Sequence, residues 1–334
     1  MSLDALIRDA RAPLSRGDTE SLFQSIFRGE LNETQLIAYL TATADRKPTV
    51  EELVGAVTAM RTHMRPVTAP ADAIDLCGTG GDGLGTLNIS TAVFFVVAAA
   101  GVPVAKHGNR SATSRSGTAD VLEALGVKIG LEPDVAERVL KDAGLVFLFA
   151  QTHHPAMKYV GAARKAIGRR TIFNLLGPLA SPARVTRQLI GVFSADWVEP
   201  YAQALHQLGS ARARIVHGRD GLDEISISEP TQVAVLENGT VTVGEITPEL
   251  AGLARSPLAA IVGGDAVHNA AALRRLFDGE PGPYRDIVCL NAAAALMVAG
   301  VASDIKAGVK IAAEQLSSGA AREKLNDLIA ASNA

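Results

Sequence analysis

The chain has 334 residues, 48% of them hydrophobic and 20% charged, and a formal net charge of −3. This size allows one large core or two unequal ones, and the mild negative charge argues against a nucleic-acid-binding surface. The longest apolar run, residues 92–105, is too short to span a bilayer, and no signal segment is recognisable. Cys77 and Cys289 lie in apolar surroundings without CxxC spacing, which is typical of buried thiols. We therefore expect a cytoplasmic protein with neither a membrane nor a nucleic-acid partner.

The first part of the chain predicts helices. Apolar residues at three-to-four spacing indicate a helix around residues 22–27, which Gly29 ends, and a second helix around residues 36–40. Thr49-Val50-Glu51-Glu52 is a capping box, which predicts that a third helix begins there.

A proline-bearing connector, residues 65–72, is the best candidate for a domain boundary. We therefore expect a helical N-terminal domain over residues 1–65, joined by helical segments near residues 165–185. Residues 73–334 are expected to form an α/β domain that binds the substrate.

The next stretch predicts an anion site. Residues 73–77 indicate a buried strand, which ends in the glycine-rich segment 78–83. Ser90 and Thr91 follow as expected caps of an apolar helix over residues 92–100, whose N-terminus carries unpaired N–H groups and partial positive charge. Strand, glycine loop and helix together indicate a phosphate site. A tight turn with packing glycines is the alternative for the loop alone.

The glycine loop differs from two familiar nucleotide motifs. Gly78-x-Gly80-x-x-Gly83 fits the dinucleotide fingerprint, but its helix begins too late and residues 96–105 contain no acid to hold a ribose. A P-loop needs a lysine, and none occurs between Asp72 and Ala105. Asp82 would repel a bare phosphate unless a metal ion or sugar hydroxyls intervene. The loop therefore favours a phosphorylated sugar with a metal.

Further along, strands and helices alternate, which predicts a largely parallel sheet covered on both faces. A strand is expected over residues 102–105, and the segment 106–110 that follows it carries two cations and an amide. We expect this segment at the same sheet edge as the glycine loop. Asn238-Gly239 is the strongest two-residue hairpin signal, and residues 265–334 are again mostly helical. The other predicted elements are helices over 119–125 and 134–143 and strands over 145–150, 189–193, 215–217, 234–237 and 240–243.

Three other places could carry chemistry. Asp223-Glu224 is expected to precede an alternating strand and could reach a hard cation, although an acidic pair is more often solvated surface. Arg164 belongs to the basic cluster 164–170. Its planar guanidinium could form two hydrogen bonds to a carboxylate or phosphate, or the residue could lie on a solvent-exposed helix face. His153-His154 has no partner at metal-ligand spacing, so we expect these histidines to be structural.

Four motifs in order resemble one family of enzymes. They are GTGGDGLGTLNIST, KHGNRSATSRSGTADVLEALG, RRTIFNLLGPL and HGRDGLDEIS. They closely resemble the family of phosphoribosyltransferases and pyrimidine nucleoside phosphorylases that includes the anthranilate phosphoribosyltransferases of tryptophan biosynthesis. The likeness runs from about residue 4 to about residue 325 and is far more specific than a single GxGxxG. It implies a small helical domain hinged to a large α/β domain, and a homodimer joined through the helical domain.

The resemblance also implies an activity and its site. The phosphoribosyl group of 5-phosphoribosyl 1-pyrophosphate would pass to the amine of anthranilate, with two Mg²⁺ ions per subunit. Ser90, Asp223 and Glu224 would hold the metal, and Lys106 with the two acids would be catalytic. Anthranilate would be received by Gly78, His107, Asn109, Arg164 and Gly177. Phosphoribosyl pyrophosphate would contact Gly78, Gly81, Asp82, Thr86, Asn88, Ile89, Ser90, Thr91, Lys106, His107, Gly108, Asn109, Arg110, Ser111, Ala112, Thr113, Ser114 and Thr118.

This chemistry needs orientation and charge stabilisation more than activation. Breaking the bond at ribose C1 gives an oxocarbenium-like transition state and places negative charge on pyrophosphate, at which Lys106 and helix N–H groups are aimed. We therefore expect no covalent nucleophile and assign no general base. The departures from the family pattern lie on the acceptor side, at Gln151, Ala162, Ala163 and Ser181. They leave open a related aromatic carboxylate as acceptor.

Two alternatives remain from the sequence. A pyrimidine nucleoside phosphorylase would share the fold and glycine loop but use free phosphate and a base, and Asn109 with Asp223-Glu224 favours the transferase. A non-enzymatic relative that binds nucleic acid should show a basic groove and eroded metal residues, whereas this chain is mildly acidic and keeps both acids.

Overall fold

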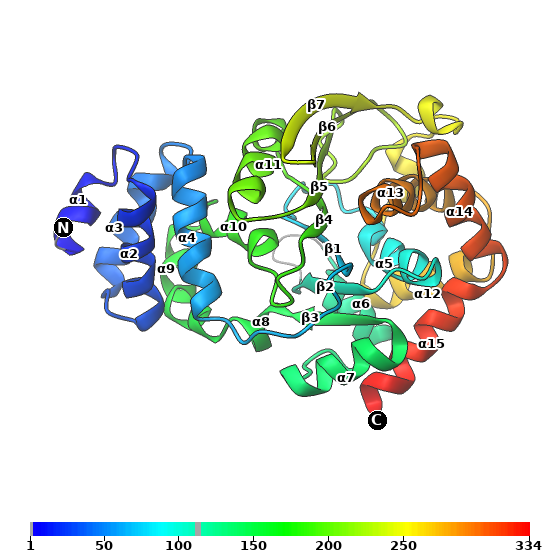
Figure 1. The fold of residues 1–334 in the computed structure, drawn as a ribbon, viewed down its shortest axis with the longest axis horizontal. Coiled ribbons are helices and arrows are strands. Elements are labelled where there is room, and N and C mark those ends of the chain that lie inside the picture. Colours follow the sequence, from blue (N-terminus) through cyan, green and yellow to red (C-terminus); the bar gives the residue numbers. More distant parts are fainter. Residues whose placement is uncertain (1–2, 111–114) are drawn as a thin grey trace.

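The computed structural model describes residues 3–110 and 115–334. The predicted contacts Ser111, Ala112, Thr113 and Ser114 lie outside the described residues. Figure 1 shows a group of helices at the N-terminal end, a sheet in the centre and the C-terminal helices at the other end. The N-terminal helices are α1 (Leu3–Asp9), α2 (Arg16–Arg28), α3 (Glu33–Ala44) and α4 (Val50–Thr62).

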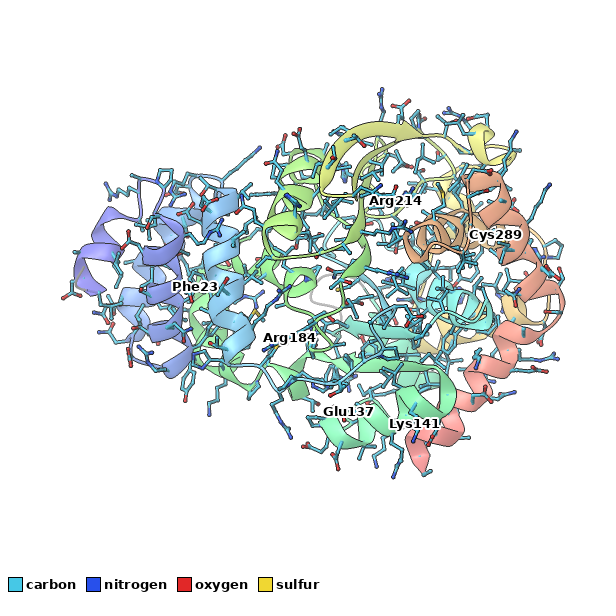
Figure 2. The ribbon with its side chains drawn as sticks, viewed as in Figure 1. Phe23, Glu137, Lys141, Arg184, Arg214 and Cys289 are labelled. Carbon is cyan, nitrogen blue, oxygen red and sulfur yellow. The ribbon has the colours of Figure 1, made fainter. Side chains whose placement is uncertain are left out.

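Local sequence signals determine where these helices begin and end. Gly29 ends α2 in the left-handed conformation, with φ 74°, as the sequence predicts. Thr49 and Glu52 form the expected capping box at the start of α4. Phe23 of α2 points into the core of this region, where it packs edge-on against Tyr39 (Figure 2). The apolar stripes of the helices are therefore buried against one another.

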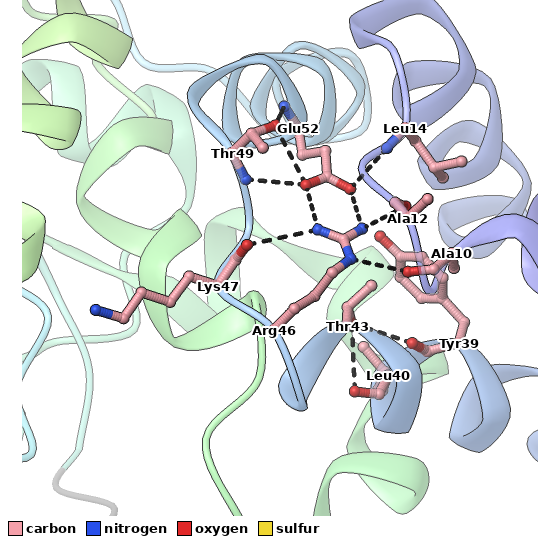
Figure 3. A network of polar contacts seen from close by, with 10 residues as sticks. All are labelled: Ala10, Ala12, Leu14, Tyr39, Leu40, Thr43, Arg46, Lys47, Thr49 and Glu52. Carbon is pink, nitrogen blue, oxygen red and sulfur yellow. Dashed lines mark hydrogen bonds and ion pairs between the residues drawn. The ribbon is translucent and has the colours of Figure 1, made fainter.

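Glu52 also joins α4 to the preceding segments (Figure 3). Its side chain is 1% exposed and accepts hydrogen bonds from the Leu14 amide at 3.1 Å and the Thr49 amide at 2.9 Å. Arg46 donates to the same carboxylate at 2.7 Å and to the Ala10 carbonyl at 3.0 Å. Each of the two charges has its partner inside the protein. Removing Glu52 or Arg46 alone would therefore lower the free energy of unfolding by about 3–5 kcal/mol.

The sheet has seven strands in the order β3-β2-β1-β4-β5-β6-β7. The first five positions pair in parallel and the last two pairs are antiparallel, which confirms the expected mostly parallel sheet. Asn238 and Gly239 both have positive φ, 52° and 74°, so the predicted hairpin turn is also confirmed. The strands are β1 (Ile74–Gly78), β2 (Val104–Gly108), β3 (Leu145–Phe149), β4 (Arg187–Gly191), β5 (Arg212–Gly218), β6 (Thr231–Glu237) and β7 (Thr240–Ile246).

Both faces of the sheet are buried, because neighbouring strand residues point in opposite directions. Leu189 of β4 belongs to a core that includes α5 (Ile89–Ala99) and α13 (Pro283–Ala299), where Cys289 lies (Figure 2). The next residue, Ile190, belongs to a second core that includes α11 (Val198–Gln207) and also the N-terminal helices. The helical region and one sheet face thus share a continuous apolar core.

The remaining helices cover the sheet and connect its strands. Within the described residues, none is both long enough and apolar enough to cross a membrane. They are α5 (Ile89–Ala99), α6 (Thr118–Leu125), α7 (Pro133–Ala143), α8 (Ala150–His153), α9 (Gly161–Ile167), α10 (Phe173–Leu176), α11 (Val198–Gln207), α12 (Ala266–Phe277), α13 (Pro283–Ala299), α14 (Ile305–Ser317) and α15 (Ala320–Asn333).

Three expected element boundaries near the glycine loop were wrong. Helix α5 begins at Ile89, so Ser90 and Thr91 lie in its first turn and are not caps. Strand β2 continues to Gly108, because it pairs with β3 along its whole length, and Lys106 is therefore inside the strand. Asp223-Glu224 lies in the loop between β5 and β6, and no strand begins until Thr231, eight residues after Asp223.

Candidate active site

Two glycines lie opposite each other where β1 and β4 end. Gly78 pairs with Gly191, and the carbonyl of Gly191 accepts the Thr79 amide at 2.9 Å. The loop that follows has positive φ at Gly80, Gly81, Gly83 and Gly85. Such backbone favours glycine, and it lets the loop turn tightly at this sheet edge.

Three carboxylates converge beside this loop. Asp82 lies within hydrogen-bonding reach of Asp223, and its charge also acts on Glu224. Burial and the neighbouring acids Asp82 and Glu224 raise the pKa of Asp223 well above its usual value. Burial likewise raises the pKa of Glu224 to about 7, with Asp82 adding to the rise and Lys106 opposing it. Mutual repulsion of this kind is relieved by a bound cation.

Lys106 and the start of α5 face these acids. The Lys106 side chain is 2% exposed, and its ammonium donates to the Leu76 carbonyl and to the Ser90 hydroxyl at 3.4 Å. The backbone amide and hydroxyl of Ser90 also act on Glu224 and oppose the rise of its pKa. A cation and a helix N-terminus thus adjoin the carboxylates, an arrangement that suits an anion bridged by a metal.

The other residues at the start of α5 are held by neighbours. Asn88, the residue before the helix, accepts from Asn269 at 2.8 Å, and its carbonyl accepts the Tyr284 hydroxyl at 3.2 Å. Thr91 donates to Thr118 at 3.1 Å. Two further predicted contacts are more constrained: Ile89 is 2% exposed and so offers only backbone, and Thr86 forms a backbone bridge with Val262.

Gly108, which ends β2, and the two residues after it are placed by their neighbours. Arg110 forms ion pairs with Asp120 at 2.7 Å and Glu123 at 2.5 Å, because α6 turns its acidic side toward this arginine. Gly108 is tightly packed, since a Cβ there would lie 2.8 Å from the Phe147 ring. Asn109 is exposed.

The predicted acceptor residues form a second group. Arg164 in α9 is half-buried, lies 5.8 Å from the Phe173 ring centroid, and has its pKa lowered by burial. None of the ion pairs formed by the described side chains involves Arg164. The His107 ring is buried beside the Gly177 backbone, and the His154 ring lies 5.1 Å away between centroids. His154, predicted as structural, therefore adjoins a predicted site residue.

Sequence reasoning missed two side chains. Arg170 donates to the Gly81 carbonyl and stacks on Phe193, with 4.2 Å between guanidinium carbon and ring centroid. Asp75, fully buried in β1, accepts the His107 amide at 2.9 Å. The available signal for Asp75 was an acid inside an otherwise apolar strand.

The donor set beside the glycine loop fits Mg²⁺, since the carboxylates of Asp82, Asp223 and Glu224 and the Ser90 hydroxyl are hard oxygen ligands. A second grouping lies in the strands, where ligand atoms of Asp75, Cys77 and His107 are within 4.8 Å of one another. The Lys106 ammonium also acts on this Asp75 carboxyl.

The chain matches two parts of one family. Residues 3–64 match the glycosyl transferase family helical bundle domain, and residues 70–322 match the glycosyl transferase family a/b domain. The chain therefore belongs to this glycosyl transferase family. A relative from Bradyrhizobium sp. (strain ORS 278), named anthranilate phosphoribosyltransferase, is 56% identical over 322 residues, which are 96% of each chain.

Solved structures of similar proteins agree with this placement. Anthranilate phosphoribosyltransferase from Thermus thermophilus has a TM-score of 0.94 and 40% identity, covering 98% of this chain and 99% of that one. The Saccharomyces cerevisiae enzyme in complex with phosphoribosyl pyrophosphate and Mg has a TM-score of 0.91 and 27% identity, covering 99% and 98%. The same yeast enzyme in complex with 4-fluoroanthranilate has a TM-score of 0.88 and 26% identity, covering 99% of both chains.

Proposed function

We propose that this protein transfers the phosphoribosyl group of 5-phosphoribosyl 1-pyrophosphate to the amine of anthranilate, a step of tryptophan biosynthesis. One structural observation carries the proposal. Asp82, Asp223 and Glu224 converge from two distant segments beside a glycine loop, a buried Lys106 and the N-terminus of α5. The names of the relatives at more than half identity support the same activity. Neither alternative drawn from the sequence is favoured.

The chain's own groups are suited to stabilise the departing pyrophosphate. Asp82, Asp223, Glu224 and Ser90 would hold Mg²⁺, which neutralises charge on pyrophosphate when bound. Lys106 and the backbone amides at the start of α5 would share the negative charge that develops as the C1 bond breaks. Gly78, Gly80, Gly81 and Gly83 of the glycine loop have no side chains to obstruct that approach. These groups are fixed by burial and hydrogen bonds, so little reorganisation accompanies the reaction.

The acceptor would bind on the other side of the ribose. Arg164 can offer its guanidinium fork to the anthranilate carboxylate, with His107, Asn109, Gly78 and Gly177 around the ring. Since an aromatic amine is a weak nucleophile, holding it in line with C1 is the main contribution of these residues. No side chain is proposed as a general base.

The departures from the family pattern flank this acceptor side. Gln151 and Ala162 are exposed, whereas Ala163 and Ser181 are buried. Michaelis constants for anthranilate and its ring-substituted analogues would show whether these residues change acceptor preference.

We extend the proposal to two Mg²⁺ ions per subunit and to a cytoplasmic homodimer joined through the helical domain. We also place the domain boundary in residues 65–72, between the two matched family domains. Analytical ultracentrifugation would test the dimer, and calorimetric titration of Mg²⁺ in the presence of phosphoribosyl pyrophosphate would count the ions.

A fluorescence assay tests the activity directly. Anthranilate fluorescence should fall when the protein, phosphoribosyl pyrophosphate and Mg²⁺ are combined, and it should persist when any of the three is omitted. Phosphorolysis of thymidine is the control for the related phosphorylase activity. Persistent anthranilate fluorescence together with release of thymine would overturn the proposal.

A further inference from the structure

Strands β1 and β2 lie side by side, but their backbones pair in register at a single pair of residues. Ile74 lies opposite Val104, and its amide donates to the Pro103 carbonyl at 3.0 Å. By contrast, β1 pairs with β4 over all five of its residues, and β2 pairs with β3 over all five. The boundary between residues 74–78 and 104–108, here termed the β1–β2 seam, is therefore open in the sense that it lacks the backbone ladder of the neighbouring parallel pairs.

Two side chains occupy the place of the missing backbone bond. With Ile74 opposite Val104, a continued parallel ladder would join the His107 amide to the Leu76 carbonyl. Instead, the His107 amide donates to the Asp75 carboxyl at 2.9 Å, and the Leu76 carbonyl accepts from the Lys106 ammonium. Both backbone groups therefore keep a hydrogen-bond partner. The His107 amide bonds to the side chain of Asp75, the neighbour of Leu76, and the Leu76 carbonyl bonds to the side chain of Lys106, the neighbour of His107.

This exchange determines where Lys106 lies. Its ammonium is buried in the seam, 3.4 Å from the Ser90 hydroxyl, and it acts electrostatically on both Asp75 and Glu224. If the seam closed, the Leu76 carbonyl would pair with the His107 amide and the ammonium would lose that anchor. The open seam thus keeps the cation between the strands and the metal-binding acids.

We propose that Asp75 is a positioning residue, which holds the β1–β2 seam open and thereby directs Lys106 toward Ser90 and Glu224. Asp75 is 0% exposed, so it does not contact substrate itself. Burying a carboxyl inside an apolar strand costs free energy of folding. Its hydrogen bond to the His107 amide offsets part of that cost and is the contact that holds the seam open. The inference deepens the proposed function and rests on it.

Asp75→Asn and Asp75→Leu separate the two tasks of this side chain. Asparagine keeps an oxygen for the His107 amide but loses the charge beside Lys106, and turnover should fall about tenfold. Leucine removes the acceptor as well, so the seam can close, and turnover should fall about 100-fold. Thr43→Val, which removes a buried hydroxyl in α3, is the control for loss of stability alone and should keep wild-type turnover.

A double-mutant cycle tests whether Asp75 acts through Lys106. Asp75→Asn should lower turnover in the wild-type background but change it less than about twofold in a Lys106→Met background. Equal effects in both backgrounds would overturn the proposal, as would wild-type turnover in folded Asp75→Leu. The cycle uses Asp75→Asn and Lys106→Met but not Asp75→Leu. It therefore still tests the proposal if the leucine variant does not fold.

A crystal structure of Asp75→Leu gives a readout that does not depend on activity. In that variant the His107 amide should bond to the Leu76 carbonyl and the Lys106 ammonium should leave that carbonyl, whereas Asp75→Asn should keep the wild-type bonds. An unchanged seam in Asp75→Leu would overturn the proposal even if turnover fell. Absence of transferase activity in the wild-type protein would instead refute the proposed function, and the structure of the variant would still test the seam.

Discussion

The backbone carbonyl oxygen of Asp223 lies 1.5 Å from the point that a Cβ at Gly191 would occupy. A Cβ at Gly78 would lie 3.2 Å from the Gly191 carbonyl oxygen and would make only ordinary contact, at 3.6 Å, with the carboxylate oxygen Oδ2 of Asp223. The absence of a side chain at Gly191, where β4 ends, therefore lets the acidic loop lie directly against the sheet. Glycine at this position places the acids and does not serve only to make a turn.

Gly191→Ala should displace the Asp223 loop, because the new methyl group cannot share space with the Asp223 carbonyl. We expect a loss of stability of about 1–3 kcal/mol, and turnover lower by about 100-fold. Steady-state kinetics at several Mg²⁺ concentrations would measure the second effect. Gly130→Ala is a matched control, since nothing lies within 4 Å of its Cβ position. Normal turnover in Gly191→Ala would show that the loop position is unimportant.

Asp223→Asn combined with Glu224→Gln should lower turnover sharply while the fold survives. Burial and mutual repulsion raise the pKa of both acids, so neutral isosteres should leave the metal-free protein as stable as the wild type or more so. The rise in melting temperature caused by Mg²⁺ with phosphoribosyl pyrophosphate should disappear. Thermal melts with and without these ligands provide the measurement. Near-normal activity in magnesium-limited buffer would argue against a metal site here.

Arg164→Met should raise KM for anthranilate at least about tenfold and leave KM for phosphoribosyl pyrophosphate nearly unchanged. The physical reason is that this half-buried guanidinium has no ion-pair partner among the described residues and can accept a carboxylate. Lys165→Met changes an exposed cation on the same helix and is the matched control. Equal rises in both Michaelis constants would indicate a general disturbance of the site.

His154 should make the fold sensitive to acid. Burial lowers its pKa from 6.5 to about 4, with His153 adding to the shift. The folded state thus disfavours the charged ring, so stability is complete above pH 6.5 and declines as the pH falls toward 4. Between about pH 7.5 and pH 4.5 this one group should remove about 2–3 kcal/mol from the free energy of unfolding.

Urea unfolding at both pH values would measure this effect against two variants. His154→Gln should flatten the pH dependence by that amount, because glutamine does not titrate. Thr43→Val, which removes a buried hydroxyl that does not titrate, is the control and should leave the dependence unchanged. The same slope in wild-type and His154→Gln proteins would refute the prediction.

Much of the fold could be predicted from the sequence, because its signals are local. The Thr49 capping box, the left-handed Gly29 and the Asn238-Gly239 turn each depend on a few neighbouring residues, and all three are confirmed. Alternating apolar runs gave the largely parallel sheet for the same reason. Element ends depend on pairing with distant segments: β2 extends through Lys106, beyond the expected end at residue 105, because β3 pairs with it.

Only the tertiary structure decided which charged groups meet. Asp82 joins Asp223 and Glu224 although four strands of the sheet separate them along the chain, and Arg110 turns to the acids of α6. The open β1–β2 seam could not be predicted from the sequence either. Its side-chain hydrogen bonds replace a backbone hydrogen bond, whereas the spacing of apolar residues in a strand predicts the regular backbone bond. Periodicity reports how a segment presents its side chains, whereas the partner of a buried charge depends on the packing of distant segments.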